Sequence, residues 1–103
     1  MSLYRIVIEV VEVRGKCAAG YKPGDRIVLN GFYIVSRGSS NVCMHAFSAM
    51  MSLLSAFAHG ASARELGIGS SDDEGYLQCP DPGRPYTCGG TVVFRLKRVG
   101  EAR

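Results

Sequence analysis

The sequence predicts an α+β fold: a small, mainly antiparallel sheet of about four to five strands with one long apolar helix packed on it. Two patterns lead to this class. β-branched residues alternate with polar ones near both ends of the chain, and an uncharged apolar stretch at 42–59 has helical spacing. With 103 residues and no linker-like segment, the chain is expected to form a single domain over 1–103. The first and last strands are expected to be neighbours in the sheet.

The first strand is predicted over residues 3–13. One face carries Tyr4, Ile6, Ile8 and Val10, whereas Arg5 and Glu9 fall on the other face. The adjacent pair Val10 and Val11 interrupts the alternation and predicts a β-bulge.

A hairpin follows the first strand. Residues 14–25 are rich in glycine and proline and are predicted to form a loop. Asn30-Gly31 then lies between two apolar runs, which is a strong hairpin signal because both residues tolerate a positive φ. Strands are therefore predicted at 26–29 and 32–35.

The stretch at 42–59 is predicted to be the helix, with Asn41 as its N-cap and Gly60 just past its end. Its polar residues recur at intervals of four and three, so they form one narrow stripe: Asn41, His45, Ser48, Ser52, Ser55 and His59.

Such a helix is expected to lack a conventional solvent face, because no Asp, Glu, Lys or Arg occurs between Gly38 and Ala63. Burial between the sheet and a second subunit would cover it, so we expect a homo-oligomer formed through the 42–59 helix. A membrane span is not expected, since the polar stripe interrupts the apolar surface.

The C-terminal part is predicted to contain a short helical turn at 62–66, an acidic solvated loop around 72–74 and a short strand at 76–79. Residues 80–90 hold three prolines and three glycines and cannot form regular structure. The final strand is predicted at 91–99, with these residues facing the core: Val92, Phe94 and Leu96.

The distribution of charge along the chain does not favour binding to a nucleic acid. The net charge is +3, from twelve Lys and Arg against nine Asp and Glu, and the basic residues are scattered. The nearest approach to a cluster is Arg95, Lys97 and Arg98, which we interpret as a solvated strand face. Nucleic-acid binders usually show a denser basic stripe with aromatic residues, so no nucleic-acid partner is expected.

Four cysteines are spread along the chain: Cys17, Cys43, Cys79 and Cys88. No apolar leader precedes the first strand, so a reducing, cytoplasmic location is expected, where cysteines are more typical of thiols or metal ligands than of disulfides. None belongs to a C-x-x-C pair, the spacing that marks zinc sites most clearly. Four interpretations stay open: inert buried thiols, metal or cluster ligands, redox or nucleophilic thiols, and a Cys79–Cys88 disulfide.

Cys43 is expected in the first helical turn, where the helix dipole and free N–H groups stabilise a thiolate. It is therefore a candidate catalytic nucleophile or single metal ligand, with His45 as a candidate catalytic partner. Residues two positions apart on a helix point about 200° away from each other around its axis. Cys43 and His45 therefore form a poor chelate unless the helix begins later. A buried, hydrogen-bonded His45 is the simpler expectation. Asp81, between two prolines, is expected to cap backbone N–H groups.

Three motifs occur together: G-x-C-x-x-G-Y-x-x-G-D around Cys17, N-V-C-x-H-A at the predicted helix start, and C-P-D-P-G followed by G-G-T-V-x-F. With them the chain resembles, over nearly its whole length, a family of short, uncharacterised bacterial and archaeal proteins. The resemblance implies a shared set of positions: Cys17, Cys43, His45, Cys79, Asp81, Gly89 and Gly90. Cys88 is less typical of the pattern, so the resemblance implies a three-cysteine site and does not name its chemistry.

The leading hypothesis is a small cytosolic protein with a cysteine-lined site, in which Cys17, Cys43 and Cys79 bind zinc or an iron–sulfur cluster. One alternative is a thiol-based redox enzyme or sulfur carrier that uses Cys43. Another is a structural or oligomerisation module whose thiols are inert. Whether the chain is an enzyme is left open by the sequence.

Overall fold

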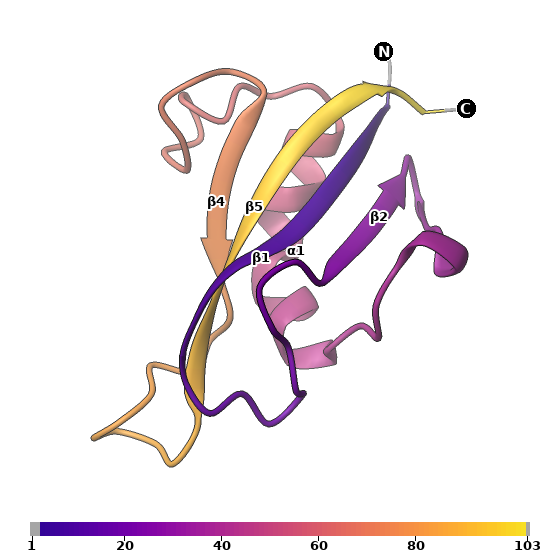
Figure 1. Ribbon diagram of the computed structural model, residues 1–103. Helices are drawn as coiled ribbons and strands as arrows, with labels where there is room; N and C mark the ends of the chain where they lie inside the picture. The colour runs from indigo at the N-terminus through magenta and orange to yellow at the C-terminus, as the bar shows by residue number, and fades with distance from the viewer. Residues whose placement is uncertain (1–2, 103) are drawn as a thin grey trace.

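The computed structural model describes residues 3–102 as a five-stranded antiparallel sheet with one α-helix packed against one face (Figure 1). The elements follow in the order β1 (Tyr4–Gly15), β2 (Arg26–Asn30), β3 (Tyr33–Ile34), the 3-10 turn η1 (Ser36–Gly38), α1 (Met44–Ala58), β4 (Glu74–Gln78) and β5 (Gly90–Glu101). Across the sheet the order is β3-β2-β1-β5-β4. The predicted fold class is confirmed, and so is the pairing of the first and last strands.

The long strands β1 and β5 form the centre of the sheet and supply much of the core. The predicted alternation holds on both strands: Ile8, Phe94 and Leu96 are fully buried against α1. The register of β1 on β5 shifts between Val10 and Glu12, which confirms the bulge at Val11. Because of this extra residue Val13 returns to the core side, where plain alternation would direct Glu12 inward.

The β2–β3 hairpin forms as predicted, but its loop is shifted by one residue. Asn30 pairs with Tyr33, so the two-residue loop is Gly31-Phe32. Gly31 has φ +63°, whereas Asn30 keeps a negative φ, and the expectation of a positive φ at both Asn30 and Gly31 was wrong. A glycine at the first loop position is a standard hairpin solution. This turn leaves the Phe32 side chain 79% exposed.

Helix α1 begins at Met44, later than the predicted residue 42, and its N-cap is Cys43 instead of Asn41. Cys43 has an extended conformation (φ −72°, ψ 120°), and its carbonyl accepts the first helical hydrogen bond from the Phe47 N–H. The cause lies outside the helix. The Tyr21 hydroxyl donates to the Asn41 carbonyl and accepts the Cys43 N–H, both at 2.7 Å, which holds 41–43 extended.

The C-terminus of α1 follows the prediction. Gly60 has φ +103°, and its N–H donates to the Phe57 carbonyl. The next N–H, from Ala61, donates to the Ala56 carbonyl. Together these bonds form a Schellman motif, which satisfies carbonyl groups at the helix end.

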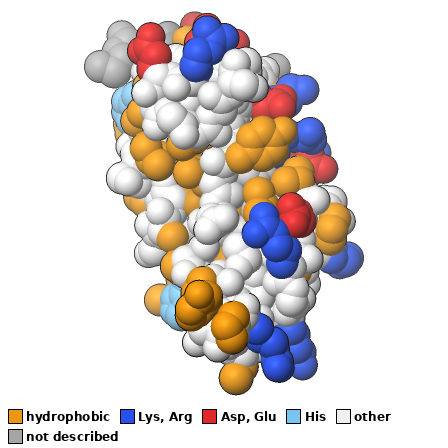
Figure 2. All heavy atoms as spheres, turned by 90° about the vertical axis from the view of Figure 1, so that its left-hand side faces the viewer, with side chains coloured by type: hydrophobic (Ala, Val, Ile, Leu, Met, Phe, Trp, Pro, Cys, Tyr) orange, Lys and Arg blue, Asp and Glu red, His pale blue; other side chains and the backbone are white. Residues whose placement is uncertain are grey.

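The polar stripe of α1 faces solvent. The buried face consists of Ala46, Met50, Leu54, Phe57 and Ala58. The exposed face holds Met44, His45, Ser48, Ala49, Met51, Ser52 and Ser55. The expectations of a helix without a solvent face and of a buried His45 were therefore wrong. This exposed face carries no Asp, Glu, Lys or Arg; Figure 2 shows charged side chains at the top and right of the view and none along the left edge between the two histidines.

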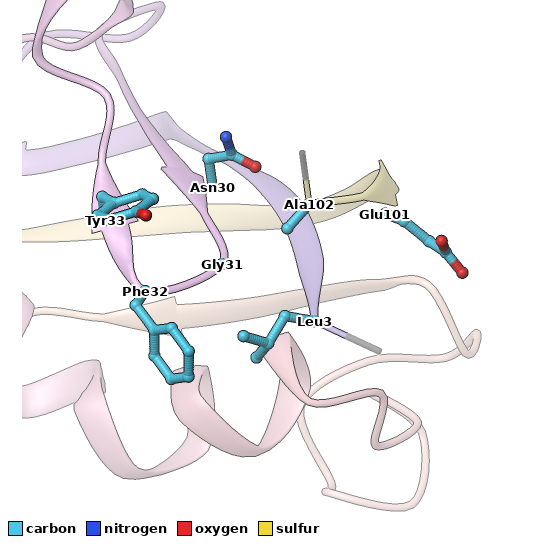
Figure 3. A pocket seen from close by; sticks show the side chains of 7 residues that line it. All are labelled: Leu3, Asn30, Gly31, Phe32, Tyr33, Glu101 and Ala102. Carbon is cyan, nitrogen blue, oxygen red and sulfur yellow. The ribbon is translucent and has the colours of Figure 1, made fainter. Parts of the chain in front are cut away.

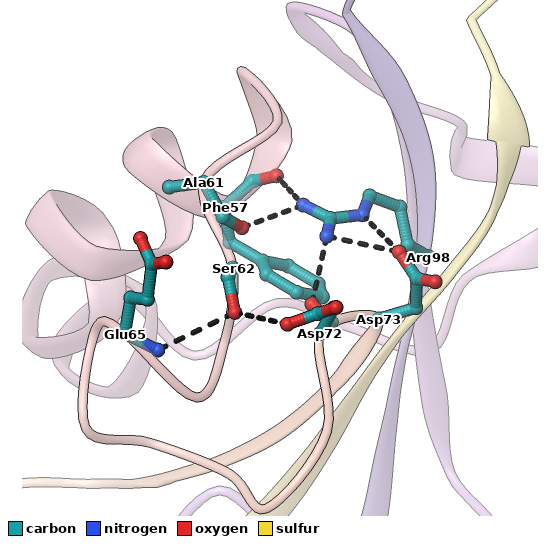
Figure 4. A network of polar contacts seen from close by, with 7 residues as sticks. All are labelled: Phe57, Ala61, Ser62, Glu65, Asp72, Asp73 and Arg98. Atoms are coloured by element: carbon teal, nitrogen blue, oxygen red, sulfur yellow. Dashed lines mark hydrogen bonds and ion pairs between the residues drawn. The ribbon is translucent and has the colours of Figure 1, made fainter.

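The Arg98 side chain is largely covered, contrary to the expected solvated face. It continues the inward alternation from Leu96, and its side chain is 7% exposed. Its guanidinium lies 4.3 Å from the centroid of the Phe57 ring. It donates to the carbonyls of Phe57, Ala61 and Asp72 and pairs with Asp73 (Figure 4). One cation thus joins β5, the end of α1 and the acidic loop, so part of that loop has a structural role.

None of the helices within residues 3–102 has the length and hydropathy needed to cross a membrane.

Candidate functional site

Three of the four cysteines line one small cavity, about 100 Å³ in volume. Cys17 comes from the loop after β1, Cys43 from the start of α1, and Cys79 from the segment after β4. All three are partly buried and pack against the hydrophobic core. The rest of the lining combines small apolar residues with three polar side chains: Ala18, Ala19, Tyr21, His45, Ala46, Pro80, Asp81, Gly90 and Val92.

The close approach of β1 and β5 places Cys17 beside this cavity. Gly15 and Gly90 face each other across the two strands, and Gly15 has φ +80°. A Cβ on Gly90 would meet the Arg14 carbonyl oxygen and would lie 2.6 Å from the Lys16 nitrogen. Glycine at position 90 is therefore needed to let the chain at 14–16 lie against β5.

Cys79 is tied to β5 through backbone and sulfur. Its N–H donates to the Val92 carbonyl at 3.0 Å, and its Sγ accepts the Val92 N–H at 3.2 Å. The thiol also donates to the Gly90 carbonyl at 3.8 Å and to the Asp81 carbonyl at 4.0 Å. The strand pairing and these contacts thus position the sulfur beside the cavity.

Asp81 organises the loop that follows Cys79. Its carboxylate accepts the Thr87 hydroxyl and the Gly83 N–H, and its carbonyl accepts the Thr91 hydroxyl at 2.6 Å. The bond from Thr87, followed by that from Gly83, lowers the pKa of Asp81 below its ordinary value. The expectation that Asp81 caps backbone N–H groups is confirmed.

Cys43 and His45 lie on the same cavity even though they are two positions apart. The objection drawn from helical geometry does not apply, because Cys43 precedes the helix and has an extended backbone. Its side chain makes no capping hydrogen bond, so the sulfur is not engaged with the first turn. His45 is exposed, and it therefore lies at the rim of the cavity.

Tyr21 is the site residue that sequence reasoning missed. It is 8% exposed, packs edge-on against Phe94 with ring centroids 5.7 Å apart, and lines the cavity beside the cysteines. Burial is the main cause that raises the pKa of Tyr21 above its ordinary value. The sequence feature that could have identified it is a tyrosine inside a glycine-rich loop, because a loop that lies wholly in solvent has no need of an aromatic side chain.

Cys88 stands apart from this group. It is exposed on the 80–90 loop and does not line the cavity. All four cysteines are free thiols, so the structure contains no Cys79–Cys88 disulfide.

The three thiols share a cavity without standing at metal-ligand positions. Within the described residues 3–102, no three His, Cys, Asp or Glu side chains are grouped so that they could hold a metal ion.

Two other hollows lie near the β2–β3 turn. One, about 310 Å³, is lined by turn residues and both ends of the chain; Figure 3 shows Phe32 directing its ring toward the helix while Glu101 points away. It contains no thiol or histidine. The other, about 140 Å³, lies between the turn and α1 and is mostly apolar, with these lining residues: Leu29, Gly31, Phe32, Met51, Leu54, Ser55, Ala58 and His59.

No family model, curated protein or solved structure matches the chain. The fold and the site together define a small α+β protein with a thiol-lined cavity. The family resemblance inferred from the motifs stays a prediction.

Proposed function

We propose that the cavity lined by Cys17, Cys43 and Cys79 binds a soft metal ion, with zinc as the first candidate. The observation that carries this proposal is the meeting of three thiols from three distant segments at one small cavity. Thiolates are the preferred ligands of zinc and of iron–sulfur clusters. The proposal places the protein in the reducing cytoplasm, where such thiols stay available.

Two local features position the sulfurs for this role. Cys43 is the N-cap of the 15-residue helix α1, and its side chain makes no capping hydrogen bond. Cys79 Sγ accepts the Val92 N–H at 3.2 Å, which fixes it against β5.

Zinc is the first candidate because a single ion is bound by thiolates with few ligands, and an iron–sulfur cluster held by the same cysteines is the alternative. The proposal includes a rotation of the cysteine side chains on binding, because they do not already stand in a ligand arrangement.

Native mass spectrometry with elemental analysis tests the proposal on untagged protein that is purified anaerobically and reconstituted with zinc. We expect one zinc per chain, and lower occupancy in each of Cys17→Ser, Cys43→Ser and Cys79→Ser. Cys88→Ser is the matched control, because this thiol is exposed and outside the cavity. Circular dichroism checks that every variant is folded. Full occupancy in all three site variants, or no uptake by the wild type, would rule out the proposal.

A second candidate is thiol chemistry at Cys43, as in a redox enzyme or a sulfur carrier. It is favoured by the position of Cys43 at the N-cap, its lack of a capping bond, and its shared cavity with His45. Iodoacetamide labelling followed by peptide mapping measures the reactivity of each cysteine. We expect Cys43 to react faster than the more exposed Cys88, because an activated nucleophile outruns a thiol that is only more accessible. Faster labelling of Cys88 would contradict thiol chemistry at Cys43.

The third candidate is a structural module that self-associates through α1. Its support is the uncharged exposed face of the helix and the adjoining apolar groove beside Phe32. We propose a second copy of the chain as the occupant, because an uncharged face meets its own copy without charge repulsion. This candidate alone predicts inert thiols, with slow labelling and no bound metal.

A further inference from the structure

A further hollow, about 360 Å³ in volume, lies between the end of β1 and the loop at 80–90. That loop joins β4 to β5 and projects beyond the sheet (Figure 1). The lining of the hollow combines Arg14 and Arg84 with three glycines, one proline and one threonine. It includes no acidic residue of the described chain, so the side-chain charge of the lining is positive.

Hydrogen bonds fix the turn that carries Arg84. The Gly83 carbonyl accepts the N–H groups of Tyr86 and Thr87 at 2.9 and 3.0 Å, which closes a turn between them. The Asp81 carboxylate accepts the Gly83 N–H at 2.8 Å and also the Thr87 hydroxyl, so both ends of this turn are held. The backbone at Arg84 is therefore positioned before any ligand binds.

The charge of Arg84 is unused within the part of the chain that the structure describes, because its guanidinium makes no hydrogen bond or ion pair there. Arg14 pairs with Glu12 at 2.6 Å, but both side chains are more than half exposed. Such a pair contributes little in water, so Arg14 can exchange Glu12 for another anion. The Asp81 carboxylate lines the thiol cavity instead, where the donors of its own loop occupy it.

We propose that this hollow binds a phosphate group, either as the free anion or as part of a small phosphate monoester. A guanidinium group suits phosphate because its planar N–H groups pair with two oxygens at once. Arg14 and Arg84 come from different segments, and a phosphate group has oxygens in several directions with which to meet both. The glycines keep side chains out of the space between ligand and backbone. The hollow shares no lining residue with the thiol cavity, so its ligand is independent of the proposed metal.

Amide NMR spectra recorded during a titration with inorganic phosphate, at constant ionic strength, test this site. We expect saturable shifts at Gly83, Arg84 and Gly89. Phenyl phosphate and acetate are titrated in parallel. Tighter binding of phenyl phosphate than of inorganic phosphate would identify a monoester as the ligand, and equal binding would identify the free anion. Acetate binding as tight as that of phosphate would overturn the assignment to phosphate.

Substitutions of single arginines identify the ligating side chains. Arg84→Ala should weaken phosphate binding at least about tenfold, because hydrogen bonds between charged groups are lost. Arg84→Lys should fall between the two, since an ammonium group keeps the charge without the paired N–H groups. Arg37→Ala is the matched control, because this arginine is exposed on η1 and outside the hollow. Shifts that never saturate, or equal affinity in Arg84→Ala and the wild type, would overturn the site.

Glu12→Gln tests the second arginine in the opposite direction. It releases Arg14 from its ion pair, so phosphate affinity should rise by up to about fivefold. Glu65→Gln is the control, because it changes the net charge equally at an exposed residue outside the hollow and should leave the affinity near that of the wild type. An equal rise in both variants would mean that phosphate is attracted by net charge alone, and would overturn Arg14 as a ligand.

Discussion

The Tyr21 hydroxyl accepts the backbone N–H of Cys43 at 2.7 Å, across 22 positions of sequence. Through this bond a loop residue after β1 sets the residue at which α1 begins, and with it the direction of the Cys43 side chain. The same hydroxyl donates to the Asn41 carbonyl, so one side chain satisfies two backbone groups just before the helix. The site geometry therefore depends on Tyr21 as much as on the cysteines.

Tyr21→Phe removes this hydroxyl and retains the ring against Phe94. We expect a loss of about 1–3 kcal/mol in the free energy of unfolding, because the Cys43 N–H and the Asn41 carbonyl lose their partner. Zinc affinity should fall as well. Urea denaturation and a zinc competition titration measure the two effects. Tyr86→Phe is the control, since Tyr86 is 80% exposed. Equal zinc affinity in Tyr21→Phe and wild type would show that the site does not depend on the Tyr21 hydroxyl.

Gly90→Ala introduces a methyl group where β5 lies against the chain at 14–16. The added carbon meets the Arg14 carbonyl and would lie 2.6 Å from the Lys16 nitrogen, so backbone must move. We expect a destabilisation of at least about 1–3 kcal/mol in thermal unfolding. Gly38→Ala is the control, because its nearest contact would be an ordinary 3.4 Å from a Val28 methyl group. Similar melting temperatures for both variants would show that β5 accommodates the methyl group.

Asp81 should make stability depend on pH in acid. Its pKa is lowered in the folded protein, so its contribution is present above the ordinary aspartate pKa and is lost as pH falls through the lowered value. We expect the free energy of unfolding to fall from about pH 4 downward. In Asp81→Asn the protein should be less stable at neutral pH and show a shallower acid slope. Urea denaturation at each pH measures this, and identical slopes would exclude the role of Asp81.

Arg98→Met removes a largely covered cation and keeps most of its apolar stem. The carbonyls of Phe57, Ala61 and Asp72 then lose their donor, and we expect at least about 1.5–3 kcal/mol of destabilisation. Lys97→Met is the matched control, because this neighbour on β5 is exposed. Chemical denaturation of both variants compares them. If Lys97→Met lost as much stability as Arg98→Met, the hydrogen bonds from Arg98 to the three carbonyls would not be the cause.

Self-association through α1 should depend on Phe32, which is exposed beside the apolar groove. If a second copy covers this face, Phe32→Ser lowers the dimer fraction in sedimentation velocity. Tyr86→Ser serves as the control, since this residue is equally exposed on the 80–90 loop. If the wild type is still monomeric at a protein concentration about 100-fold above a micromolar dissociation constant, a stable dimer is excluded.

Short-range patterns accounted for the strands and for the end of the helix. The alternation that ends in Phe94 and Leu96 marks the core side of β5, and the bulge at Val11 is visible as one broken alternation. The same alternation points Arg98 inward. Covering its side chain still required carbonyl groups from α1 and the acidic loop, and no local pattern announces these partners.

The sequence by itself determined the α+β class, the pairing faces of the long strands and the glycine that ends α1, because these depend on periodicity and on the conformations that single residues allow. Only the tertiary structure decided that α1 begins after Cys43, and that Cys17, Cys43 and Cys79 line one cavity with His45 at its rim. Those features depend on contacts between segments far apart in the chain, such as Tyr21 with Cys43 and Gly15 with Gly90. Such contacts form only when the sheet and the helix pack together.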